Sequence, residues 1–114
     1  MVCVYDVEDK IKASLYGIVK LDAEGKIIDF EEKPEEPKST LAAMAIYFFP
    51  KKTLSLITEY LSTKEKKDAP GFFLKWLFKK DKVFAYEFKG RWFDIGSIDS
   101  YKKANEIWLD KVVT

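Results

Sequence analysis

The apolar run at residues 41–49 restricts the fold of this chain more than any other stretch. Its sequence is Leu-Ala-Ala-Met-Ala-Ile-Tyr-Phe-Phe, with no charged residue. A run of this length fits a central strand that is buried on both faces of a sheet. The small residues Ala42, Ala43 and Ala45 leave room either for a packed helix or for a ligand close to the backbone. We therefore expect a sheet built around this strand.

The remaining elements follow from the spacing of apolar residues. Apolar or alternating segments predict further strands at residues 2–5, 15–21, 26–32 and 82–88. Helical spacing predicts helices that begin at Pro50, Asp68 and Ser97, the last two residues acting as caps. The predicted fold class is α/β, with a mixed, mainly parallel sheet of about five strands and flanking helices. No linker or repeat divides the sequence, so we expect one domain over residues 1–114.

Composition excludes several classes of protein. Hydrophobic residues make up 47% of the chain and aromatic residues 16%, which indicates a folded domain and not a disordered one. The net charge of +1, with no basic stripe among the aromatics, argues against nucleic acid as a partner. No apolar run approaches the roughly 18 residues of a membrane span.

Residue types that often carry catalysis or bind metal are scarce. Histidine is absent and Cys3 is the only cysteine, so no His/Cys metal site can form and no catalytic residue is assigned. A lone cysteine suits the reducing cytoplasm. The chain also lacks glutamine and is rich in lysine and glutamate, a bias typical of heat-adapted proteins.

Glu32 and Lys33 stand at the end of the strand predicted at residues 26–32, just before Pro34, which ends the backbone ladder. A carboxylate accepts hydrogen bonds from hydroxyls and an ammonium pairs with phosphate, so a sugar phosphate would satisfy both. Alternation places Glu32 with Ile28 and Phe30 on one face and Lys33 on the other, so a shared ligand requires the strand to end or twist there. The alternative is a charged strand end that faces water.

Several short motifs occur in an order and spacing typical of one enzyme family. The motifs are Tyr16-Gly17, residues 30–34, Pro37-Lys38-Ser39, Ala45-Ile46-Tyr47, Asp68-Ala69-Pro70-Gly71 and residues 91–96. With these motifs the chain, from about Val2 to Trp108, resembles the second half of the sugar-1-phosphate nucleotidyltransferases, closest to enzymes like glucose-1-phosphate thymidylyltransferase and mannose-1-phosphate guanylyltransferase. The resemblance implies the second half of a Rossmann-like domain.

The resemblance also implies roles for four residues. Glu32 would accept hydrogen bonds from the sugar hydroxyls, Lys33 would hold the sugar phosphate, and the backbone of Gly17 would touch the sugar. Asp94 would be one of two aspartates that bind Mg²⁺, the ion that bridges the phosphates. Without the resemblance, the favoured interpretation of Asp94 is a cap or turn acid ahead of the last helix.

One part of the family pattern is missing. Family members carry, near the N-terminus, a glycine-rich loop that cradles the triphosphate, and later a second metal-binding aspartate, but no such loop precedes Tyr16. We therefore expect a sugar 1-phosphate partner, a nucleoside triphosphate only if another chain completes the site, and no full reaction from this chain alone. The alternative is a non-catalytic relative that acts as a binding or oligomerisation module. An uncovered sheet edge or apolar face would favour a homodimer. The identity of the sugar and nucleotide, and whether the chain is a fragment, stay open.

Overall fold

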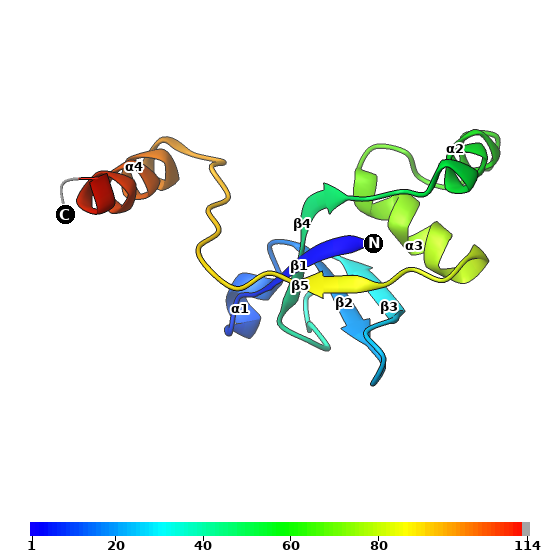
Figure 1. Cartoon of the computed structure of the whole chain (residues 1–114), viewed down its shortest axis with the longest axis horizontal. Coiled ribbons are helices and arrows are strands. Elements are labelled where there is room, and N and C mark those ends of the chain that lie inside the picture. The colour runs from blue at the N-terminus through cyan, green and yellow to red at the C-terminus, as the bar shows by residue number, and fades with distance from the viewer. Residues whose placement is uncertain (113–114) are drawn as a thin grey trace.

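The computed structural model describes the backbone of residues 1–112 and the side chains of residues 1–110. Its five-stranded sheet has the order β3-β2-β4-β1-β5, so the apolar run does form the central strand, as predicted (Figure 1). The strands are β1 (Val2–Asp6), β2 (Gly17–Leu21), β3 (Ile27–Glu32), β4 (Leu41–Tyr47) and β5 (Ala85–Glu87). The helices are α1 (Lys10–Ala13), a 3-10 turn η1 (Lys51–Thr53), α2 (Leu54–Leu61), α3 (Pro70–Lys80) and α4 (Ile98–Val112). The α/β class and the mixed sheet are confirmed.

The prediction of a mainly parallel sheet is wrong for the described strands. Only β1 and β5 run parallel there, whereas β1–β4, β2–β3 and β2–β4 pair antiparallel. The reason lies in the connections. A parallel neighbour needs a crossover of a dozen residues or more, but β2 and β3 are joined by a tight turn, and β4 inserts between β2 and β1 and pairs antiparallel with both.

Helix α3 covers one face of the sheet and completes the main core (Figure 1). Leu74 and Leu77 from this helix pack with Val19 of β2 and Phe30 of β3, and all four are almost fully buried. Ile18, next to Val19 in β2, instead packs on the opposite face with Ala13, Ala42 and Trp92. Alternation along β2 thus separates two hydrophobic clusters.

The sheet curls so that its two outer strands meet at one end. The backbone N–H of Ile27 donates to the carbonyl of Val83 at 2.8 Å, and the N–H of Ala85 donates to the carbonyl of Gly25 at 2.9 Å. The turn between β2 and β3 therefore covers part of the β5 edge.

Two irregular strands change which side chains are buried. In β4 a register shift against β1 coincides with Ala45 at φ +60°, and Ala45 and Ile46 are exposed, so the prediction of burial on both faces is wrong for that half. In β3 a second shift places Ile27 in the core and leaves Ile28 44% exposed, opposite to simple alternation. An extra residue in one strand has this effect because it reverses the side-chain pattern beyond it.

The predicted caps have different outcomes. Ala69 precedes α3 and makes no side-chain capping bond, so the assignment of Asp68 as a cap is wrong. Ser97 does cap α4, because its Oγ accepts from the N–H of Ser100 at 3.1 Å.

Helix α4 lies apart from the rest of the molecule, at the end of an extended segment, and gives the structure dimensions of 48 × 28 × 27 Å (Figure 1). Several of its large apolar residues are consequently open to solvent, including Ile98, Tyr101 and Trp108, whereas Ala104 is buried. None of the helices within the described residues has the length and apolar character needed to cross a membrane.

Candidate functional site

The Glu32 carboxylate lies between two glycines from different elements. Glu32 pairs directly with Gly17 in the β2–β3 ladder. A Cβ atom placed on Gly17 would lie 3.1 Å from Glu32 Oε2, and one placed on Gly71, in the first turn of α3, would lie 2.1 Å from the same oxygen. The Phe30 ring borders both glycines, so Phe30 and Glu32 share the face that α3 covers. The structure thus brings Gly17 and Glu32 together.

Lys33 follows Glu32 where β3 ends. Its φ of +46° takes the backbone out of the extended conformation, and its N–H donates to the carbonyl of Tyr16 at 3.0 Å. A left-handed residue at this point breaks the alternation that would otherwise hold Glu32 and Lys33 on opposite faces. The positive charge of Lys33 acts on Glu32 and partly offsets the rise in its pKa. The strand therefore ends where a ligand shared by the two residues would require it.

The electrostatics of Glu32 differ from those of an ordinary surface acid. Burial raises the pKa of the Glu32 carboxyl, Lys33 lowers it, and the negative charge of Asp68 raises it further. Burial also raises the pKa of Tyr47, and the charge of Glu32 adds to that rise. Among the described residues, no hydrogen bond or salt bridge engages the Glu32 carboxylate. A half-buried carboxylate without a protein partner can accept hydrogen bonds from a ligand.

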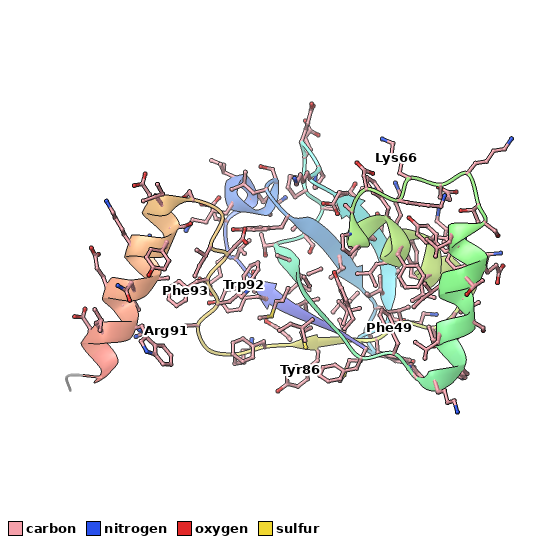
Figure 2. The ribbon with its side chains drawn as sticks, turned by 90° about the horizontal axis from the view of Figure 1, so that it is seen from above. Phe49, Lys66, Tyr86, Arg91, Trp92 and Phe93 are labelled. Carbon is pink, nitrogen blue, oxygen red and sulfur yellow. The ribbon has the colours of Figure 1, made fainter. Side chains whose placement is uncertain are left out.

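Asp94 borders a different hollow, of about 400 Å³, that opens on the face of the sheet opposite α3. The hollow is also lined by Asp6, Tyr16, Trp92 and Lys103. Trp92 packs against the rings of Tyr16 and Tyr5 at tilted angles, with ring centroids 5.1 and 5.7 Å away. Figure 2 shows Trp92 and Phe93 in the segment that leads from the sheet to α4.

Tyr16 connects the two regions. Its carbonyl accepts from Lys33, while its side chain lies near Asp94: burial raises the pKa of the Tyr16 phenol, and the charge of Asp94 raises it further. Within the described residues, the charge of Asp94 acts on Tyr16, whereas the charges of Lys33 and Asp68 act on Glu32. The structure therefore brings Asp94 near Tyr16 and does not place it next to Glu32.

The described residues include no cluster of three acidic or cysteine side chains able to hold a metal ion. Mg²⁺ usually binds through one or two carboxylates, with water and substrate phosphates as its other ligands. The exposed carboxylate of Asp94 fits the role of one such ligand, and the remaining ligands would have to come from elsewhere.

The sequence alone did not place Gly71, Tyr47 or the side chain of Tyr16 in the site, and it suggested only a helix cap for Asp68. A signal for Gly71 was present, because Pro70-Gly71 puts the poorest helix formers into a first turn. Proline is favoured in the first turn of a helix, but glycine is not. A glycine in that turn therefore indicates that another part of the chain packs too closely there for a side chain.

Comparison with known proteins gives a consistent result. A family model described as nucleotidyl transferase matches residues 2–111. Two curated relatives are glucose-1-phosphate adenylyltransferases: one from Lachnospira eligens is 41% identical over 100 residues and one from Thermomicrobium roseum is 38% identical over 105 residues. Each match covers 87% of this chain but 24% of the relative, so the chain spans about a quarter of their length.

Solved structures of the same kind are similar in fold. A UDP-glucose pyrophosphorylase complexed with UDP-glucose superposes with a TM-score of 0.76 at 28% identity, over 96% of this chain and 44% of that one. A putative glucose-1-phosphate thymidylyltransferase from Bacillus anthracis gives a TM-score of 0.70 at 32% identity, over 93% of this chain and 42% of that one.

Proposed function

This chain belongs to the nucleotidyl transferase family, and we propose that it forms the sugar-phosphate-binding part of an enzyme that makes nucleotide sugars of the NDP-glucose type. In that reaction a phosphate oxygen of the sugar 1-phosphate bonds to the α-phosphorus of a nucleoside triphosphate, and pyrophosphate leaves. Both reactants are anionic, so catalysis depends mainly on alignment and charge neutralisation. Residues 1–114 would be one partial domain, and a second chain or segment would supply the triphosphate-binding loop.

The observation that carries this proposal is the environment of Glu32. Its half-buried carboxylate has no protein partner among the described residues and faces the side-chain-free surfaces of Gly17 and Gly71. Leaving a charged group in this state costs stability. A sugar hydroxyl that donates a hydrogen bond to the carboxylate would offset that cost. Ligand binding would therefore explain why a carboxylate occupies this half-buried position.

The other predicted residues take complementary roles. Lys33, exposed at the end of β3, would neutralise the phosphate of the sugar. The backbone of Gly17 would contact the sugar ring. Asp94 would supply one ligand to Mg²⁺, which neutralises phosphate charge when bound.

Calorimetric titration with glucose 1-phosphate tests the sugar site. We expect Glu32→Ala and Lys33→Ala each to weaken binding by about 10- to 100-fold, as for loss of a charge-assisted hydrogen bond. Glu31→Ala is the matched control, because Glu31 is the neighbouring carboxylate of β3 but pairs with Lys38 at 3.7 Å. Equal binding by all three variants would refute the site.

Pyrophosphate release with a nucleoside triphosphate and Mg²⁺ tests the reaction. We expect none from the chain alone, and release only when a segment with the glycine-rich loop is added. Steady release from the purified chain would contradict the assignment of a partial domain.

The second candidate function is an oligomerisation module, and the uncovered apolar face of α4 favours it. Ile98, Tyr101 and Trp108 are spaced along one side of that helix and are 74%, 58% and 66% exposed. A second copy of the chain could cover them in a two-fold dimer. Analytical ultracentrifugation should show a dimer at micromolar concentration that Trp108→Asp dissociates, and a monomeric wild-type chain would contradict it.

We also propose a reducing, cytoplasmic setting in a heat-adapted cell. Cys3 is a free thiol, and lysine and glutamate are abundant. Reversible thermal unfolding above about 80 °C would support heat adaptation, whereas a midpoint in the range of about 45–65 °C, typical of mesophilic domains, would contradict it.

A further inference from the structure

The first turn of α3 lies so close to Glu32 that any side chain at position 71 would overlap with the Glu32 carboxylate as it now stands. The Cβ of an alanine there would lie 2.1 Å from Glu32 Oε2, 2.9 Å from the Phe30 ring and 3.2 Å from the carboxyl carbon of Glu32. Real Cβ atoms essentially never approach a heavy atom within 3.0 Å, so an alanine would displace at least one of these groups.

Backbone conformation does not explain the glycine. Gly71 does not have the positive φ of Gly25 or Gly90. It lies next to Pro70 at the start of an eleven-residue helix, where alanine is the better helix former. Space beside Glu32 is the remaining reason.

We propose that Gly71 is a positioning residue: because it lacks a side chain, α3 closes over Glu32 and holds the Glu32 carboxylate beside Gly17. This inference rests on the proposed function, in which that carboxylate accepts from a sugar hydroxyl.

The surroundings determine where the carboxylate would go if Gly71 became alanine. The Phe30 ring is 2% exposed within the core and already borders Gly17, so it cannot yield cheaply. The end of a glutamate side chain rotates freely by comparison. Glu32 would therefore swing outward, away from Gly17, and the much smaller overlap with the Phe30 ring, at 2.9 Å, would need only a slight shift at the start of α3.

The titration of Glu32 reports this movement. Burial is the largest cause of its raised pKa, and the charged or titratable groups that act on it are Lys33 on its own strand, Asp68 ahead of α3 and Tyr47 on β4. A carboxylate that swings into water loses the effect of burial, so its pKa falls toward the ordinary value of a glutamate.

Gly71→Ala tests the inference, with Gly96→Ala as the matched control because a Cβ at Gly96 meets nothing within 4 Å. Carbon-detected NMR of the Glu32 carboxyl follows its pKa, and calorimetry follows binding of glucose 1-phosphate. We expect Gly71→Ala to keep its circular dichroism spectrum, to lower the pKa of Glu32, and to weaken binding by about 10- to 100-fold. Gly96→Ala should change none of these.

The two readouts separate the possible failures. An unchanged pKa of Glu32 in Gly71→Ala would overturn the positioning role, and so would a lowered pKa with unchanged sugar phosphate binding. If the wild-type chain itself does not bind glucose 1-phosphate, the proposed function fails, while the NMR titration still decides whether Gly71 holds the carboxylate in place.

Discussion

Replacing Trp92 with alanine should lower the free energy of unfolding by about 3 kcal/mol. Trp92 lies against Tyr16 and Tyr5, and each aromatic pair contributes about 1 kcal/mol beyond the area that it buries. The side chain is half-buried, and covering half of a large aromatic contributes about 1 kcal/mol more. Trp92 is thus the main attachment of the segment that carries Asp94 and α4.

Urea unfolding followed by circular dichroism measures this loss. Ile95→Ala is the matched control, because Ile95 is an apolar residue of the same segment but is 55% exposed, and we expect it to change stability by less than about 0.5 kcal/mol. If Trp92→Ala costs no more than Ile95→Ala, the three rings do not anchor the segment and the reasoning fails.

A second measurement on Trp92→Ala locates the effect. Burial and then the charge of Asp94 raise the pKa of the Tyr16 phenol. Without Trp92 the ring becomes wetter and Asp94 is no longer held nearby, so the pKa of Tyr16 should fall toward its ordinary value. NMR titration of ¹³C-labelled tyrosine checks this, and an unchanged Tyr16 pKa would show that the segment stays in place.

Three further changes have defined outcomes. The folded state raises the pKa of Glu32, so the contribution of Glu32 to stability should fall as pH rises through and above the ordinary glutamate value. Urea unfolding at pH 4 and pH 7 should show that Glu32→Gln removes this contribution and is more stable than the wild type at pH 7. Thr40 donates a hydrogen bond to Asp6 at 2.6 Å, and this bond is the largest cause of the lowered pKa of Asp6. Thr40→Val should therefore lower the free energy of unfolding by about 1 kcal/mol at pH 7, and by less at acid pH, where Asp6 is protonated. Urea unfolding measures both values. Leu77→Ala should cost about 3 kcal/mol by the same assay, because Leu77 is 1% exposed in the main core, and a cost below about 1 kcal/mol would mean that this core collapses around the cavity.

The regular elements of this fold can be predicted from sequence because their signals are local. The run at residues 41–49 identified the central strand, and Asp22 to Gly25 marked the turn between β2 and β3. The strand directions needed more than local signals. They depend on which strands become neighbours in the sheet, and β4 pairs with β2 and β1 instead of with β3, the strand that precedes it in the sequence.

The errors lie where one residue shifts the register. The bulges near Ala45 and Ile28 reverse which side chains face the core, and neither residue is a glycine that would signal a bulge in the sequence. The same limit applies to the candidate site. Glu32 and Lys33 could be singled out as neighbours in sequence, but Gly71 reaches Glu32 only through the packing of α3 on β3.

The alternation of β2 divides the candidate site into two parts. Gly17 lies on the α3 face beside Glu32, whereas the Tyr16 side chain lies on the opposite face with Trp92 and the hollow of Asp94. A single ligand can therefore meet both carboxylates only by passing over the end of β2 and β3, where Lys33 turns the backbone with its φ of +46°. This arrangement makes the two sides separable: Gly71→Ala should change the pKa of Glu32 but not that of Tyr16, and Trp92→Ala should do the reverse. A change in both values from either substitution would mean that the sheet transmits strain between its faces and that the two carboxylates belong to one rigid site.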